Sequence, residues 1–158
     1  MKVLSLTVRG FVDSLSPRPE LPIVARGTSL KEVVRAMVKG HRRRIVYVVD
    51  SKGQLMGSIT LNDLKDVVFR YYLNGRVPDV LVFTEHIERL FDSERAEDLM
   101  ARNLPVCHEY EGLREVIARM IQQDVQDIPV LDKESRVVAD LDILDLLELW
   151  VRRGGEVF

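Results

Sequence analysis

Two residues in the first half of the chain have types and spacing that could bind a phosphate and a sugar. Thr60 and Asp63 lie three positions apart at the start of a predicted helix, in the pattern Thr-x-x-Asp. As a structural pattern this is a capping box, in which the Thr60 hydroxyl accepts a hydrogen bond from a first-turn N–H and the helix dipole favours Asp63. The same helix start could hold a phosphate beside the Thr60 hydroxyl, with Asp63 accepting hydrogen bonds from a ribose diol. One copy of the pattern favours the capping role.

The second half contains the same spacing with a different first residue. Asp142 and Asp145 lie three positions apart before a second predicted helix. A carboxylate at the first position caps a helix well but repels a phosphate, at a cost of about 1 kcal/mol per close pair in partly solvated surroundings. We therefore expect this stretch to bind phosphate poorly.

A basic run, His41–Arg44, comes directly before a predicted strand. Guanidinium groups suit phosphate because their N–H fork and delocalised charge match its oxygens. Arg44 is the best candidate for such a contact, whereas Arg42 and Arg43 are expected to be solvated. The run lacks interleaved aromatic residues and the chain has a net charge of −2, so a nucleic-acid surface is not predicted.

The sequence offers no catalytic arrangement, which needs a nucleophile, a base and an orienting group within reach. Cys107 and His108 are neighbours on a predicted strand, so their side chains point to opposite faces and cannot pair. Cys107 is the single cysteine, which excludes an intrachain disulfide and a thiolate metal cluster, and we expect it to be a buried core thiol. The other histidines, His41 and His86, offer no ligand spacing.

The composition is that of a globular protein. The 158 residues are 46% hydrophobic and 30% charged, which disfavours a disordered chain. No apolar run approaches the roughly 18 residues that span a bilayer, and the apolar start is interrupted at Arg9, too early for a signal peptide. We expect a cytoplasmic protein without membrane insertion. Residues 1–80 hold 14 basic and 7 acidic side chains, and residues 81–158 hold 9 and 18, which fits an anion-binding half or a head-to-tail dimer.

The two halves repeat one pattern, with an offset of 83 residues that becomes 82 after one slip. The matching pairs are Pro22–Ala25 with Pro105–His108, Leu30–Met37 with Leu113–Met120, and Tyr47–Asp50 with Pro129–Asp132. Each copy predicts a strand, an amphipathic helix, a strand hairpin and a closing helix. The strands are Ile23–Ala25, Ile45–Val49 and Leu55–Ile59, then Val106–His108, Ile128–Leu131 and Arg136–Ala139, with closing helices from Leu61 and Ile143. The fold class is therefore α/β (α+β), two pseudo-symmetric β-α-β-β-α units.

An extra helix is predicted between the copies. Val80, Phe83, Ile87, Leu90 and Phe91 recur at helical spacing, and we expect them to pack in the core rather than to contact a cofactor.

The paired pattern resembles the cystathionine β-synthase (CBS) domain pair, also called the Bateman module. The resemblance rests on two copies of an apolar strand followed by a closing element of the form Gly-h-x-[Ser/Thr]-x-x-Asp. These copies are Tyr47–Asp50 with Gly57–Asp63, and Ile128–Asp132 with Ala139–Asp145, and the lead-ins Val8–Val12 and Ala96–Met100 also match the family's opening. The resemblance implies CBS units at 1–78 and 96–158 and a linking helix at 79–95. It also implies a module that usually forms a homodimer and senses adenine nucleotides or related adenosyl ligands.

The resemblance implies site residues as well. The family's threonine binds phosphate and its aspartate binds ribose, which carries over to Thr60 and Asp63, while the adenine lies between the first two strands. The first site is then Ile23, Val24, Arg44, Val46, Tyr47, Thr60 and Asp63, and a possible second site is Cys107, Ile128, Pro129 and Asp145. Tyr47 replaces the family's usual proline, so it either stacks on a base or fills the slot.

The second unit leaves several alternatives. It could be empty, could take an adenosyl ligand with an uncharged tail through Asp145, or could hold Mg²⁺ through Asp140, Asp142 and Asp145. In the remaining alternative Asp142 is only a helix cap.

The function expected from this resemblance is regulation without catalysis. The chain would bind one AMP, ADP or ATP in the first unit, would require no cofactor or resident metal, and would transmit binding to an unidentified partner protein. The alternative is a ligand-free scaffold that supplies only a dimerisation surface. Which adenosyl ligand binds and which process is regulated stay open.

Overall fold

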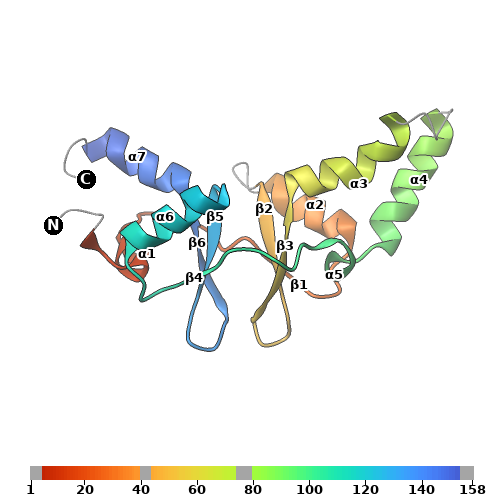
Figure 1. Ribbon diagram of the computed structural model, residues 1–158. Helices are drawn as coiled ribbons and strands as arrows, with labels where there is room; N and C mark the ends of the chain where they lie inside the picture. The colour runs from red at the N-terminus through yellow and green to blue at the C-terminus, as the bar shows by residue number, and fades with distance from the viewer. Residues whose placement is uncertain (1–4, 40–43, 74–79, 154–158) are drawn as a thin grey trace. The chain divides into compact units, whose positions relative to one another are not determined.

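The chain forms two compact units in the computed structural model, which describes residues 5–39, 44–73 and 80–153. One unit is Pro22–Leu104, and the other combines Met1–Leu21 with Pro105–Phe158. Each contains one three-stranded sheet with its helices (Figure 1). These units differ from the repeat boundaries at 78 and 96, because the segment before the first strand of each repeat packs in the other repeat's compact unit. Among the described residues, no helix has the length and apolar character needed to cross a membrane.

The unit Pro22–Leu104 is built on a sheet with the strand order β1-β2-β3. Its strands are β1 (Ile23–Ala25), β2 (Ile45–Val49) and β3 (Leu55–Thr60). β1 is parallel to β2, and β2 is antiparallel to β3, as the predicted order requires. Asp50 closes the β2–β3 turn, because its Oδ1 accepts hydrogen bonds from the amides of Lys52 at 2.8 Å and Gln54 at 3.0 Å.

Four helices complete this unit, and the apolar residues of one sheet face pack against them. They are α2 (Leu30–Lys39), α3 (Leu61–Leu73), α4 (Val80–Ser93) and α5 (Ala96–Leu99). The buried cluster contains Val24, Leu30, Val33, Met37, Val46, Val48, Ile59, Leu64, Ala96 and Met100. α4 packs on α2 and places Leu90 and Phe91 against this cluster, which confirms the predicted core role of the linking helix. The side chains of Val80 and Phe83 lie outside the described residues.

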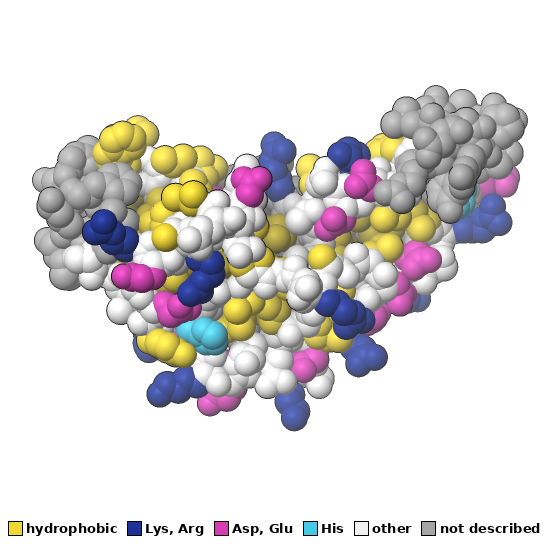
Figure 2. Space-filling view, viewed as in Figure 1, with side chains coloured by type: hydrophobic (Ala, Val, Ile, Leu, Met, Phe, Trp, Pro, Cys, Tyr) yellow, Lys and Arg dark blue, Asp and Glu magenta, His cyan; other side chains and the backbone are white. Residues whose placement is uncertain are grey.

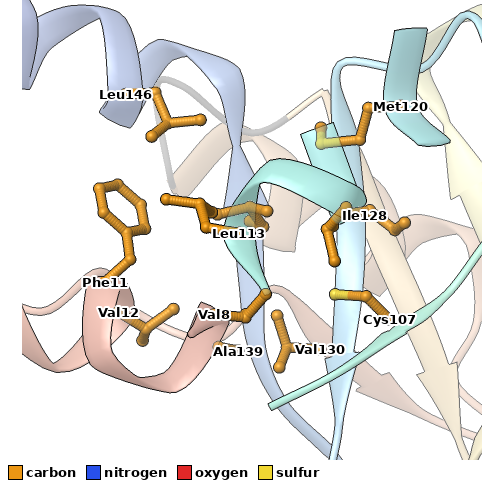
Figure 3. Close-up of a cluster of buried hydrophobic side chains, with 12 residues drawn as sticks. Val8, Phe11, Val12, Cys107, Leu113, Met120, Ile128, Val130, Ala139 and Leu146 are labelled. Atoms are coloured by element: carbon orange, nitrogen blue, oxygen red, sulfur yellow. The ribbon is translucent and has the colours of Figure 1, made fainter. Parts of the chain in front are cut away.

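The other unit has the same architecture, with the strand order β4-β5-β6. Its elements are α1 (Val8–Ser14), β4 (Cys107–His108), α6 (Leu113–Gln123), β5 (Asp127–Leu131), β6 (Val137–Asp142) and α7 (Ile143–Arg153). β6 continues to Asp142, beyond the predicted Arg136–Ala139, because it pairs with β5 over the whole length of that strand. Figure 3 shows the core of this unit, where α1, α6 and α7 meet the sheet through Val8, Phe11, Val12, Cys107, Leu113, Val116, Met120, Ile128, Val130, Ala139, Leu141 and Leu146.

Backbone hydrogen bonds fix the exchanged lead-in segments. In one unit the amide of Leu30, at the start of α2, donates to the carbonyl of Glu94 just before α5, at 3.0 Å. In the other unit the amide of Leu113, at the start of α6, donates to the carbonyl of Leu6 just before α1, also at 3.0 Å. The same connection therefore recurs in both units, and it explains why the compact units cross the repeat boundaries.

Candidate functional site

The predicted pair Thr60 and Asp63 forms a complete capping box where β3 passes into α3. The Thr60 amide donates to Asp63 Oδ2 at 2.9 Å, and the Asp63 amide donates to Thr60 Oγ1 at 3.1 Å. The two side chains thus satisfy two helix-start amides reciprocally. The structural role of the pattern is confirmed.

The capping box leaves hydrogen-bonding capacity in both side chains. The Thr60 oxygen accepts from Asp63, while its hydroxyl hydrogen can still donate to a phosphate oxygen. An ionised carboxylate has about four acceptor positions, and Asp63 uses Oδ2 for the Thr60 amide. Both residues are only partly buried, so solvent-borne groups can approach them. The box therefore keeps one donor and one acceptor available at the start of α3.

Arg44 is anchored beside the capping box through its backbone. The amide of Leu61, the residue after Thr60, donates to the Arg44 carbonyl at 2.8 Å. The Arg44 side chain is exposed. The structure thus places the Arg44 backbone next to the first turn of α3. His41, Arg42 and Arg43 lie outside the described residues.

The sheet separates the remaining predicted site residues onto two faces. Tyr47 is the register partner of Ile23 on β1, and Ile45, two residues before it, is the partner of Thr60 on β3. Side chains of register partners share a face, and residues two apart on a strand also share it. Ile23, Tyr47 and Thr60 therefore lie on one face, where Ile23 is 38% exposed.

Val24 and Val46 belong to the opposite face of the same sheet. Both side chains are buried in the cluster beneath α2. A molecule on the Thr60 face would therefore contact Ile23 rather than the side chains of these two valines. Tyr47 is fully buried, so its ring fills a slot within the structure. The sequence does not reveal which strand residues lie on which face of the sheet. Both faces are apolar here, so apolar and polar residues do not alternate along the strands.

Close packing against β3 explains why residue 57 is a glycine, which the motif alone does not reveal. A Cβ atom at this position would lie 2.5 Å from the carbonyl oxygen of Ala101 and 2.9 Å from Met100 Sδ. Ala101 forms an antiparallel bridge with Ser58, the next residue on β3. Glycine is therefore required for close backbone approach, which is one of the usual meanings of glycine within a strand.

The equivalent face of the other sheet is acidic. Asp127 is the register partner of Asp142, and Pro129 is the partner of Asp140, so these four residues share the face turned away from the core. Asp142 Oδ1 accepts a hydrogen bond from the Leu144 amide at 2.8 Å, which confirms its role as a cap of α7. A phosphate on this face would meet carboxylates instead of a hydroxyl.

Two of the four predicted second-site residues are interior. Cys107 and Ile128 are fully buried in the core of their unit (Figure 3), whereas Pro129 lies on the acidic face. Burial raises the pKa of the Cys107 thiol to about 12, with a smaller contribution from the charge of Glu111. Cys107 is thus the buried thiol that the sequence predicts, and partly exposed His108 points away from the core. The side chains of Cys107 and Ile128 are not positioned to contact a molecule on the acidic face.

Two three-stranded sheets, each followed by a helix with a capped start, are features of a known family. A family model for the CBS domain matches residues 12–70 and again residues 96–152. The chain belongs to the CBS domain family. Residues 12–70 lie in its first CBS domain and residues 96–152 in its second, and the capping box of Thr60 and Asp63 is in the first.

Relatives of this CBS pair include longer proteins. Uncharacterized protein MJ1225 of Methanocaldococcus jannaschii is 27% identical over 131 residues, which are 80% of this chain and 42% of that protein. A homoserine O-acetyltransferase of Methanosphaera stadtmanae is 24% identical over 121 residues, which are 77% of this chain and 20% of the enzyme. The chain therefore spans less than half the length of these relatives.

Solved CBS structures share the fold at identities below 25%. The CBS domain of a membrane protein from Sphaerobacter thermophilus has a TM-score of 0.70 at 20% identity, over 93% of this chain and 89% of that one. The CBS pair of protein MJ0100, solved with 5′-methylthioadenosine and S-adenosyl-L-methionine, has a TM-score of 0.62 at 22% identity, over 94% and 98%. The cytosolic domain of the Mg²⁺ channel MgtE, solved with ATP, has a TM-score of 0.59 at 24% identity, over 84% and 46%.

The alternative of a metal site in the second CBS domain gains no support from the side chains. Within residues 5–39, 44–73 and 80–153, no group of three or more His, Cys, Asp or Glu residues is arranged to hold a metal ion. Asp142 instead uses its carboxylate on the amide of Leu144.

The second CBS domain also contains an ion pair that the sequence analysis did not predict. Arg119 on α6 donates to Glu111 Oε1 at 2.6 Å and to Oε2 at 3.2 Å, and also to the Val106 carbonyl at 2.8 Å. Glu111 Oε2 accepts a further hydrogen bond from the His108 amide at 2.7 Å. The hydrogen bond from Arg119 is the main reason that the pKa of Glu111 is lowered. This pair joins β4 to α6.

Proposed function

We propose that this CBS pair is a regulatory module that binds one adenine nucleotide or related adenosyl ligand of the AMP, ADP or ATP class in its first CBS domain. The observation that carries the proposal is the reciprocal capping box of Thr60 and Asp63. It holds a hydroxyl and a carboxylate together at the start of α3, the two groups that would bind a phosphate and a ribose diol. Ile23 on the same sheet face offers apolar surface for a base.

Two related structures support the class of ligand. The CBS pair of MJ0100 was solved with 5′-methylthioadenosine and S-adenosyl-L-methionine, and the cytosolic domain of MgtE with ATP. These three molecules share an adenosine group and differ in what is attached to it. The relatives therefore support a ligand that contains adenosine. The proposed preference for a phosphate rests on Thr60 and Arg44 of this chain.

The proposal assigns phosphate binding to the first domain alone. The second domain has Asp142 where the first has Thr60, with Asp127 directly opposite it in the sheet. A phosphate there would face two carboxylates, each costing about 1 kcal/mol in partly solvated surroundings. One nucleotide per chain is the expected stoichiometry, and no step of the proposed function is catalytic.

A second candidate function is a scaffold that acts only by forming a homodimer. Large apolar side chains lie exposed on the helices of both domains at matching repeat positions, Val38 with Ile121 and Phe69 with Val151. In the second domain they gather over α6 and α7 (Figure 2), where Leu144, Leu147 and Trp150 are also about half exposed. Exposed apolar patches commonly mark protein interfaces. Matching positions in both domains favour a partner that has the same two halves, which is a second copy of the chain.

The ligand hypothesis is tested by thermal shift and calorimetry with AMP, ADP, ATP and S-adenosylmethionine, with and without Mg²⁺. A ligand at 100 times its Kd stabilises by about 2.7 kcal/mol, which raises the Tm of a protein of this size by roughly 5–10 °C. Asp63→Ala should abolish this shift, whereas the matched variant Asp145→Ala in the second domain should retain it. Wild-type affinity in Asp63→Ala would refute the site assignment.

The same experiment separates the two functions. If no adenosyl ligand shifts the wild-type Tm, the scaffold becomes the better proposal. Light scattering then measures the oligomeric state of the wild type and of Leu147→Glu, which places a charge on the exposed face of α7. The scaffold predicts a dimer that Leu147→Glu converts to a monomer, and a monomeric wild type would contradict it. The proposal also includes a regulated partner protein, which the family resemblance implies, and a cytoplasmic location, which the sequence predicts.

A further inference from the structure

A short segment of the chain is paired to the edge of β3 beside the capping box. The Ser58 amide donates to the Ala101 carbonyl at 2.9 Å, and the Ala101 amide donates to the Ser58 carbonyl at 2.8 Å. Figure 1 shows this part of the chain leaving α5 and passing β3. Ser58 precedes Thr60 by two residues on the same strand. A peptide outside the sheet is thus joined by two hydrogen bonds to the strand that ends in the candidate site.

Packing joins the same segment to the residues on either side of the capping box. Met100 is buried in the same apolar cluster as Ile59 and Leu64, which directly precede Thr60 and directly follow Asp63. The absence of a side chain at Gly57 lets Met100 and Ala101 approach β3 this closely. The Met100 amide also donates to the Ala96 carbonyl at 3.0 Å, so α5 and the bridge are continuous.

We infer that the Ser58–Ala101 bridge couples ligand binding at the capping box to the segment Met100–Leu104. This segment leads directly to Pro105, where the second compact unit resumes. The inference rests on the proposed function and adds the element that changes when the ligand binds. The chemistry of the ligand is the one already proposed, a nucleoside with a phosphate.

The coupling works because the bridge can be closed or locally open. Opening breaks both hydrogen bonds and withdraws Met100 from the cluster beneath the capping box, which loosens the end of β3. A ligand that binds the ordered end of β3 better than the loosened end shifts the bridge toward its closed state. Linkage is reciprocal, so closing the bridge strengthens ligand binding by the same factor.

Amide hydrogen exchange tests this coupling, with AMP and ATP as probes, each at 100 times its measured Kd. If the open bridge does not bind ligand, exchange of the Ala101 amide slows by up to about 100-fold. The Lys52 amide, which is bonded to Asp50 in the remote β2–β3 turn, should change far less. Ligand binding that leaves Ala101 exchange unchanged, or that slows both amides equally, would overturn the inference.

A ligand-free comparison keeps the inference testable if neither nucleotide binds. Asp63→Ala removes the acceptor for the Thr60 amide and should speed exchange of the Ala101 amide by about fivefold, the effect of losing a typical cap. Asp145→Ala, the matched change in the second domain, should leave Ala101 unchanged. Absence of binding by AMP, ADP, ATP and S-adenosylmethionine would refute the proposed function, while equal Ala101 exchange in the two variants would refute the coupling.

A substitution in the bridge itself tests reciprocity. Ala101→Pro removes the N–H that donates to Ser58, and Met100, with φ −68° and ψ 144°, already has the backbone conformation preferred before proline. Ala101→Ser keeps this N–H and is the matched control. Ala101→Pro should weaken nucleotide binding severalfold while Ala101→Ser leaves it unchanged, and equal affinities in the two variants would contradict the inference.

Discussion

Asp127 and Asp142 face each other across β5 and β6, at the positions that Ile45 and Thr60 occupy in the first CBS domain. Directly opposed residues of an antiparallel pair have Cβ atoms about 4.5–5.5 Å apart. The two domains thus share one backbone and one register but present opposite chemistry at the same place. A hydroxyl can donate a hydrogen bond to a phosphate oxygen, whereas two opposed carboxylates repel a phosphate.

Exchanging this one register pair should give the second domain a phosphate site. The double variant Asp127→Ile/Asp142→Thr recreates the pair found in the first domain, and threonine still caps a helix. Removing two carboxylates at about 1 kcal/mol each should strengthen nucleotide binding in the second domain roughly 10- to 30-fold. Isothermal titration calorimetry should then show the stoichiometry rising from one toward two nucleotides per chain.

The control for this variant removes the same charge elsewhere. Glu115→Gln/Asp124→Asn lowers the negative charge on and after α6 by two without touching the acidic sheet face. It should keep the wild-type stoichiometry. A second binding event in the control, or none in Asp127→Ile/Asp142→Thr, would show that the opposed carboxylates do not determine the difference between the domains.

Much of the fold is predictable from the sequence because the repeat supplies each pattern twice. The predicted strands Ile23–Ala25 and Ile45–Val49 have the bounds found in the structure. The capping box of Thr60 and Asp63 is also local, since its hydrogen bonds join residues three apart. Patterns of this kind depend on neighbouring residues, and the chain alone is enough to identify them.

Features that depend on distant contacts could not be predicted in this way. The match of Val8–Val12 to the family's opening does not show that β4–β6 rather than β1–β3 will cover α1. Glu111 and Arg119 are eight positions apart in the sequence, and their side chains meet because the chain turns between β4 and α6. The requirement for glycine at Gly57 likewise comes from a segment more than 40 residues away.

Gly57→Ala should destabilise the first CBS domain. Its Cβ would lie 2.5 Å from the Ala101 carbonyl oxygen, which is backbone and cannot rotate away. Overpacking of this kind costs about 1–3 kcal/mol, and urea unfolding should show that loss. Without the clash, Gly57→Ala would stabilise the domain, because alanine within a strand is favoured over glycine by about 0.5–1 kcal/mol. A stabilised Gly57→Ala would therefore show that Ala101 does not approach β3 so closely.

The Cys107 thiol should be unreactive while the second domain is folded. Burial raises its pKa to about 12 from an ordinary value of 9.0, so the folded state holds the proton where the unfolded state would lose it. The resulting contribution to stability is present below pH 9 and is lost as the pH rises toward 12. Labelling by a thiol reagent at pH 8 should be at least about 100-fold slower in native buffer than in denaturant. Equal rates would place Cys107 at the surface.

The ion pair of Glu111 with Arg119 should make the second domain sensitive to acid. The pKa of Glu111 is lowered in the folded state, mainly by the hydrogen bond from Arg119, so its contribution is present above the ordinary pKa of 4.5 and is lost as the pH falls below it. Glu111→Gln should cost about 1 kcal/mol at pH 7, after allowing for partial exposure of the pair, and less at pH 3.5. Urea unfolding at the two pH values measures this difference.

Glu32→Gln, which removes the exposed partner of Arg35 on α2, is the matched control and should change stability by less than about 0.5 kcal/mol at either pH. An equal loss in both variants, or a loss in Glu111→Gln that does not depend on pH, would show that the fork between Glu111 and Arg119 does not stabilise the junction of β4 and α6.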